Sequence, residues 1–110
     1  MNTNLREKKC APCEKGTPPL KGDDLKALRT QLSDDWKVVD ERHLEKEYSF
    51  KDFREALAFT NRVAEVAEQE GHHPDIYLTW GKVRLQLSTH SIGGLSENDF
   101  ILAAKADAKA

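Results

Sequence analysis

The longest amphipathic segment of the chain, Phe53 to Glu70, most constrains what this sequence can fold into. Its apolar side chains recur at steps of three and four residues, the spacing of one helix face, and most of its charged side chains lie off that stripe. Asp52, with a glutamate three residues on, has the form of a capping box, while Gly71 and Pro74 prevent the helix from continuing. A helix with one apolar face needs a second layer to pack against.

Segments with the two-residue period of β-strands lie on both sides of this helix. Residues 36–39 and 44–50 form the first pair, with a turn expected at 40–42. Residues 76–80 and 83–87 form the second pair, with Gly81 permitting a turn. Each pair predicts two antiparallel strands.

Two further helices are expected at the ends of this array. The first begins near Asp23, where two aspartates can cap it, and carries three leucines on one stripe. The last is opened by Ser96 and Asp99, which have capping-box spacing. The order α-β-β-α-β-β-α predicts an α+β fold, a four-stranded antiparallel sheet with helices packed on one face. The other face is open in a monomer, so oligomerisation is expected.

The chain of 110 residues is the size of one domain. Proline and glycine residues in 1–22 predict a flexible N-terminal tail, the domain itself is expected at 23–104, and 105–110 is expected to fray. Cys10 and Cys13 form a CxxC in the tail. One CxxC is half of a zinc site and no βαβ pattern surrounds it, so reduced thiols are favoured over a metal or redox role.

Charge and hydropathy exclude several classes of function. The net charge of -2 argues against a nucleic-acid binder that neutralises phosphates. No apolar run approaches the ~20 residues that span a bilayer, and the polar N-terminus is unlike a secretory signal. We therefore expect a cytoplasmic protein without a membrane or nucleic-acid partner.

Histidines are the candidate chemical groups. His72 and His73 follow the end of the long helix, and His90 follows the last strand. Imidazole suits general acid–base catalysis because its pKa lies nearest neutrality, although histidines at a helix end can also simply satisfy carbonyls. A three-histidine metal site is disfavoured, because neighbours on extended backbone point to opposite sides. GxSxG, Walker and GxGxxG motifs are absent from the sequence.

The segment around these histidines resembles the pterin-4a-carbinolamine dehydratase family. The resemblance covers residues 23–104 and includes an acidic residue four before the first histidine. It rests on Glu68-Gln-Glu-Gly-His72-His73-Pro74-Asp75, Trp80, Thr89-His90, Gly93-Gly94-Leu95-Ser96 and Asp99.

The resemblance implies a fold and a reaction. The fold is a four-stranded antiparallel sheet with helices on one face. The reaction is the dehydration of 4a-hydroxytetrahydrobiopterin to quinonoid dihydropterin, which recycles the cofactor of aromatic amino acid hydroxylases. It needs an acid for the departing hydroxyl and a base for the N5 proton, and no metal or added cofactor.

The resemblance also implies roles for individual residues. His72 and His90 correspond to the proton-transfer pair, and His73 to a residue that holds the pterin. Asp99 either orients a histidine or substrate or caps the last helix. Glu68 either orients the imidazole of His72 or is an ordinary solvated charge.

Three other residues complete the sequence-based picture. Trp80 either walls the pocket or fills the core, and Thr89 is a further candidate for binding or orientation. His43 lies outside every motif and is interpreted as a surface strand residue. Strict alternation would turn His90 away from the apolar face, so the last strand must end or bulge before it.

Two classes of function remain open at this level. The enzyme is favoured because the histidine motif is whole, whereas chaperone-type relatives tend to lose it. The alternative is a binding module of the same fold, acting as a transcription-factor dimerisation cofactor or a RuBisCO assembly chaperone. Either way, a homodimer or homotetramer is expected.

Overall fold

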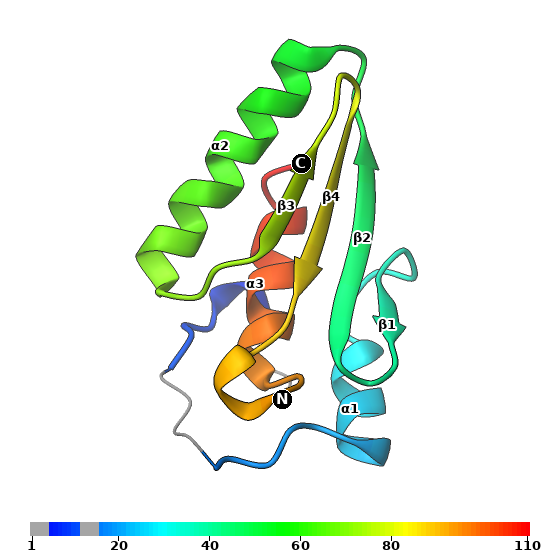
Figure 1. Cartoon of the computed structure of the whole chain (residues 1–110), viewed down its shortest axis with the longest axis vertical. Helices are drawn as coiled ribbons and strands as arrows, with labels where there is room; N and C mark the ends of the chain where they lie inside the picture. The colour runs from blue at the N-terminus through cyan, green and yellow to red at the C-terminus, as the bar shows by residue number, and fades with distance from the viewer. Residues whose placement is uncertain (1–4, 12–15) are drawn as a thin grey trace.

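The computed structural model describes residues 5–11 and 16–110, and its elements follow the expected order (Figure 1). Two short 3-10 turns, η1 and η2, are added to the expected helices and strands. The elements are η1 (Leu5–Glu7), α1 (Gly22–Arg29), β1 (Lys37–Val39), β2 (His43–Ser49), α2 (Phe53–Glu70), β3 (Asp75–Leu78), β4 (Lys82–Leu87), η2 (His90–Ile92) and α3 (Glu97–Asp107).

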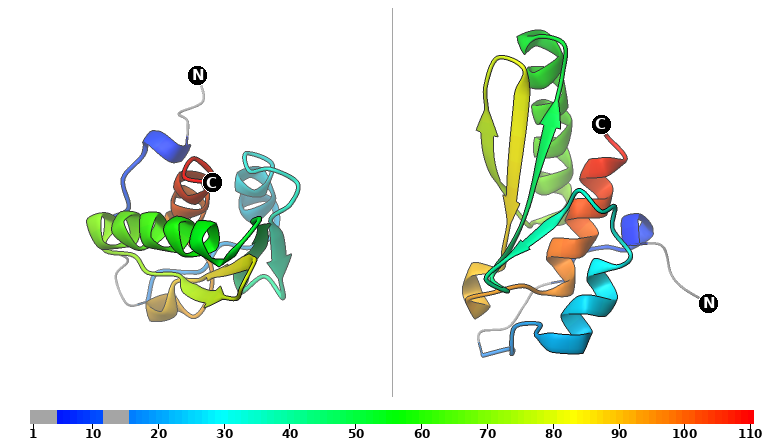
Figure 2. Two further views of the ribbon diagram at one scale, coloured as in Figure 1. Left: turned by 90° about the horizontal axis from the view of Figure 1, so that it is seen from above. Right: turned by 90° about the vertical axis from the view of Figure 1, so that its right-hand side faces the viewer.

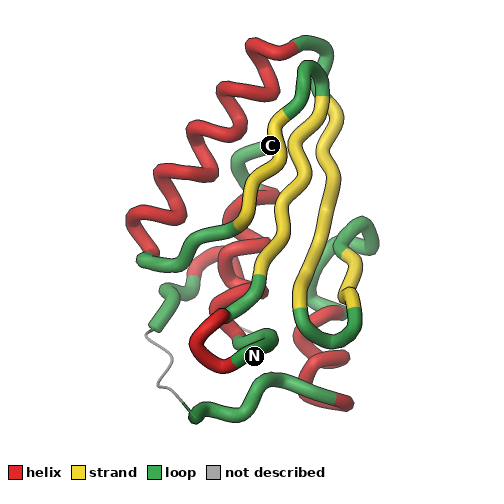
Figure 3. Tube along the Cα trace, viewed as in Figure 1, coloured by secondary structure: helices red, strands yellow, loops and turns green. Residues whose placement is uncertain are grey.

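The four strands form one antiparallel sheet in the order β1-β2-β4-β3 (Figure 3). Tyr48 pairs with Val83, which also pairs with Leu78 on the other side. The β1–β2 turn is tight because Asp40 and Glu41 adopt φ of 54° and 56°. The α+β prediction is confirmed.

The helices cover one face of this sheet and leave the other open (Figure 2, left). Alternate residues of the central strands enter the core, which is why apolar residues recur with a period of two. Burying each large apolar side chain contributes about 1.5–3 kcal/mol. The largest fully buried apolar side chains are Trp36, Phe59, Phe100, Leu44, Leu85, Leu87, Leu95, Ile101 and Leu102.

The long helix α2 has the predicted caps. The Asp52 side chain accepts a hydrogen bond of 2.9 Å from the backbone N–H of Glu55. Gly71 ends the helix with φ of 66°, a conformation that costs glycine little, and its N–H donates to the carbonyl of Ala67. This sharp stop delivers His72 directly beside the end of the helix.

The beginning of α1 differs from the prediction. The N-cap is Lys21, without a side-chain cap, because the helix begins at Gly22. Asp23 and Asp24 therefore lie inside the first turn, where their charge still complements the helix dipole.

Part of the expected tail and part of the expected frayed end pack against the domain. Residues 5–11 pack on the domain, because Leu5 is only 3% exposed and belongs to the core. The last helix continues to Asp107, because Ala106 is buried and the Asp107 carboxylate accepts hydrogen bonds from the side chains of Trp36, Lys46 and Tyr48. Cys13 lies outside the described residues. Within the described part of the chain, no helix is long and apolar enough to cross a membrane.

Candidate active site

A buried carboxylate holds the first candidate histidine. The Nε2 atom of His72 lies 2.6 Å from Oδ1 of Asp99, which is completely buried in the first turn of α3. The His72 side chain keeps 13% of its surface exposed. An ionised carboxylate only accepts, so in a pair of neutral imidazole with carboxylate the hydrogen is on Nε2 and the lone pair is on Nδ1.

The second oxygen of Asp99 fixes the carboxylate itself. Oδ2 accepts 2.8 Å from the hydroxyl of Thr89 and 3.0 Å from the backbone N–H of Ser96. The Thr89 and Ser96 hydroxyls are a further 2.7 Å apart. One oxygen of Asp99 thus caps α3 and the other contacts the imidazole of His72, while the Thr89 hydroxyl donates to the capping oxygen.

This network borders a cavity of about 300 Å3, at the small end of ligand sites. Three parts of the chain form its walls: the end of α2 with the residues after it, the β4–α3 connection with the first turn of α3, and residues 10–11. The lining residues are Cys10, Ala11, Glu70, Gly71, His72, Thr89, Ser91 and Asn98.

Glu68 has a different partner from the one expected. Its carboxylate pairs with Nε2 of His73, and both side chains are largely exposed. His72 is engaged by Asp99, so the structure does not bring the Glu68 carboxylate to His72. After the left-handed turn at Gly71, the exposed ring of His73 is the one within reach of the Glu68 carboxylate.

His90 lies on the other side of Thr89. The last strand ends at Leu87, as alternation required, and the chain then forms η2, where His90 is exposed. It lines a second cavity of about 250 Å3 together with Arg42 and His43, and Thr89 lines both cavities. The structure therefore does not bring His90 and His72 into one cavity of a single chain.

His43 is more than an ordinary surface residue. Its side chain is 29% exposed and lies 3.7 Å from Glu45, facing the second cavity. No motif marks it in the sequence, because its neighbourhood to His90 arises only from strand pairing.

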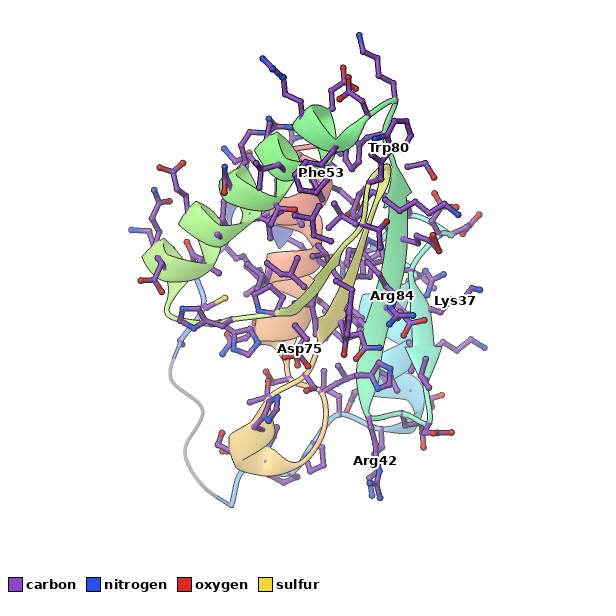
Figure 4. All side chains as sticks on the ribbon, turned by 45° about the horizontal axis from the view of Figure 1, so that its top comes forward. Lys37, Arg42, Phe53, Asp75, Trp80 and Arg84 are labelled. Atoms are coloured by element: carbon purple, nitrogen blue, oxygen red, sulfur yellow. The ribbon has the colours of Figure 1, made fainter. Side chains whose placement is uncertain are left out.

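Trp80 is separate from both cavities. It lies in the turn between β3 and β4, 69% exposed, whereas Asp75 and the histidine end of β3 lie at the other end of that strand (Figure 4). In the single chain, Trp80 neither fills the core nor lines either of the two cavities. The side chain is outside the strand, where pairing no longer turns it toward the core.

Two neighbours of the site, Asn98 and Glu70, were not selected by the sequence analysis. Asn98 exchanges hydrogen bonds with the backbone of Ala11, and Glu70 accepts 2.8 Å from the N–H of Cys10. Burial, together with the carboxylate of Glu70, raises the pKa of the Cys10 thiol to about 12. Among the residues that the structure describes, no group of three or more His, Cys, Asp or Glu side chains is arranged to hold a metal ion.

Sequence comparisons extend this picture over nearly the whole chain. A family model described as pterin 4 alpha carbinolamine dehydratase matches residues 18–109. Proteins of Alkaliphilus metalliredigens and Rubrobacter xylanophilus, provisionally named pterin-4-alpha-carbinolamine dehydratases, are 57% and 52% identical. The matches cover 94% of both chains in the first case, and 96% of this chain and 97% of its relative in the second.

Two solved structures share the fold. A protein of Brucella melitensis described as a transcriptional coactivator/pterin dehydratase has a TM-score of 0.77 and 34% identity, over 83% of this chain and 97% of that one. A pterin dehydratase-like protein described as a RuBisCO assembly factor in the alpha-carboxysome has a TM-score of 0.60 and 26% identity, over 69% of this chain and 89% of that one.

Proposed function

The chain belongs to the pterin-4-alpha-carbinolamine dehydratase family, and on that premise we propose that it is a hydro-lyase acting on 4a-hydroxytetrahydrobiopterin. The products are quinonoid dihydropterin and water. The reaction is a step of tetrahydropterin recycling.

One observation carries the proposal: the His72 imidazole is held by a buried carboxylate at the edge of a cavity. This arrangement fixes the ring and leaves Nδ1 able to take or give a proton. A base within hydrogen-bond reach of the reacting group contributes typically ~10²–10⁴-fold to rate. The opposing view, that a histidine at a helix end only satisfies carbonyls, does not account for the His72–Asp99 pair.

The proton balance assigns two tasks. One group donates a proton to the departing 4a-hydroxyl, so the C4a–O bond breaks and water leaves. Another group removes the N5 proton, whose bond electrons form the C4a=N5 double bond. We assign these tasks to His72 and His90, with the pterin seated over Thr89 between the two cavities. His73 holds the pterin from the exposed side, with its ring braced by Glu68.

The wider setting follows from the same proposal. The protein acts in the cytoplasm, with a functional link to an aromatic amino acid hydroxylase. It assembles as a homodimer or homotetramer. Phe53 and Leu57, one turn apart on α2, support assembly because they are 44% and 39% exposed. Light scattering coupled to gel filtration measures the assembly directly.

The test is dehydration of 4a-hydroxytetrahydropterin generated in situ, followed by the absorbance of quinonoid dihydropterin. His72→Ala and His90→Ala should lower kcat by ~10²-fold or more, since each removes a proton-transfer group. His73→Ala should mainly raise KM. Asn61→Ala, an exposed residue of α2 that lines neither cavity, is the control. Wild-type protein that is folded but gives no acceleration over the spontaneous rate would disprove the enzyme.

A binding module is the alternative function. Two comparisons favour it, the likeness to a transcriptional coactivator/pterin dehydratase and the likeness to a RuBisCO assembly factor. A pull-down with folded protein tests it: a partner retained equally by wild type and His72→Ala, without dehydration by either, would support a binding role alone.

A further inference from the structure

The N-terminal strap, residues 5–11, lies along α3 and reaches the cavity that contains His72 (Figure 1). Its first part is anchored in the core by Leu5, which is 3% exposed. The Lys105 ammonium donates 2.8 Å to the carbonyl of Arg6, and Lys8 forms an ion pair of 2.9 Å with Glu97. The strap is therefore part of the folded domain.

The far end of the strap is held by polar contacts at the rim of the cavity. Asn98 accepts 3.0 Å from the N–H of Ala11 through Oδ1 and donates to the Ala11 carbonyl through Nδ2. The N–H of Cys10 donates 2.8 Å to Glu70, and the Cys10 thiol lies 3.6 Å from the carbonyl of Asn98. An amide that both accepts from and donates to one residue fixes the position and the orientation of that backbone.

The first turn of α3 connects the strap to the candidate catalytic pair. Successive residues of a helix point about 100° apart, so neighbours in the sequence address different parts of the molecule. Glu97 binds Lys8, Asn98 binds Ala11, and Asp99 binds His72. The helix turn that orients the imidazole is thus the one that sets the distance of the strap from it.

We infer that Cys10 and Ala11 form one wall of the substrate cavity, and that Asn98 is the positioning residue that holds this wall closed over the pterin. The inference rests on the proposed function for the identity of the ligand. The wall acts on binding. When it is released, the substrate loses a contact surface while His72 keeps its carboxylate, so KM rises and kcat is retained.

The Cys10 thiol provides a readout that needs no turnover. In a Cys13→Ser background, Cys10 is the chain's only cysteine. Its raised pKa and its partial burial keep the thiol largely protonated at pH 8, so iodoacetamide should react at least tenfold more slowly than with an unfolded peptide. Asn98→Ala should accelerate this alkylation about tenfold, because two hydrogen bonds no longer hold the strap. In the Cys13→Ser protein that keeps Asn98, a saturating concentration of the stable pterin 7,8-dihydrobiopterin should slow the alkylation of Cys10 at least threefold.

Kinetics supply the second measurement. Asn98→Ala should raise KM about tenfold with kcat within twofold of wild type. Ala11→Leu enlarges a side chain that lines the cavity and keeps the two hydrogen bonds from Asn98 to the backbone, so it should also raise KM. Asn61→Ala, an exposed asparagine on α2, is the matched control and should change neither constant. Melting temperatures establish that each variant is folded.

The outcomes separate the wall from the reaction. If pterin leaves the rate of Cys10 alkylation unchanged, the inference that Cys10 and Ala11 form a wall of the substrate cavity is refuted, whether or not the wild type is active. The same holds if Asn98→Ala changes neither alkylation nor KM. A wild type without dehydratase activity, in which pterin nevertheless protects Cys10, overturns the proposed reaction and leaves the wall in place.

Discussion

Replacing Asp99 by asparagine separates the two tasks of this residue. The side chain keeps its shape, and one oxygen can still accept from the Thr89 hydroxyl and the Ser96 N–H. The amide nitrogen then takes the place of Oδ1, 2.6 Å from Nε2 of His72. Two N–H groups would face one another, so the imidazole must move its hydrogen to Nδ1 or turn away.

The cost in catalysis and in stability can be worked separately. The proton transfer assigned to His72 would lose its tautomer or its orientation, so kcat should fall by ~10²–10⁴-fold, the usual contribution of one general acid or base. The lost charge-assisted hydrogen bond should cost about 1.5–3 kcal/mol of folding free energy. With an unfolding entropy of about 2.1 cal/mol/K per residue, each kcal/mol lowers the Tm of a chain this size by about 4 °C.

The assay is kcat for dehydration with the melting temperature measured alongside. Glu97→Gln is the matched control, since it makes the same change in the same helix turn at an exposed carboxylate. It should leave kcat within twofold and Tm within about 2 °C. An Asp99→Asn enzyme with wild-type kcat would refute the orienting role of the carboxylate.

The remaining variants should change the stability of the fold, or leave the activity unchanged. Asp107→Asn should lower Tm by several degrees with kcat retained, and thermal melts with kinetics check this. Burial and Asp107 raise the pKa of Tyr48. Its neutral phenol therefore stabilises the fold fully below the unfolded pKa of about 10, and progressively less as the pH rises above that value. Asp107→Asn should shift the absorbance titration of Tyr48 to lower pH. Gly71→Ala places a side chain at φ of 66° in open space and should cost about 1–2 kcal/mol, seen in denaturant midpoints. Trp80→Ala should leave kcat/KM within twofold; a large loss would show that a second copy brings Trp80 to the site.

The fold was predictable because its local signals agree. The capping aspartate Asp52, the glycine stop at Gly71 and the two-residue alternation of β2 and β4 each specify an element without knowledge of the rest. The boundaries that differed, at α1 and at the end of α3, depend on tertiary contacts. In the sequence, Asp107 is simply a polar residue near the end of a helix. Its stabilising hydrogen bonds exist only once folding brings Trp36 and Tyr48 beside it.

For the candidate site, the sequence named residues that the structure brings together, but it did not show how they pair. The motif places His72 and Asp99 in the site, but their sequence separation hides which carboxylate reaches which ring. Glu68 is the nearer candidate by helical spacing, and Asp99 is the partner of His72 in the structure. Asn98 and the strap could not be found at all, because a reciprocal amide-to-backbone contact leaves no pattern in the sequence.

The path of the strap has a consequence for the order of assembly during synthesis. Lys8 and Glu97, which are joined in the folded protein, are 89 positions apart, and Lys105 is 99 positions from Arg6. At a translation rate of about 5–20 residues per second, the strap waits several seconds on the nascent chain for the helix that receives it. The strap thus leaves the ribosome long before α3 and can dock only once that helix has emerged. A fusion partner placed before residue 5 would travel with the strap and delay completion of the cavity, whereas one placed after residue 110 would not.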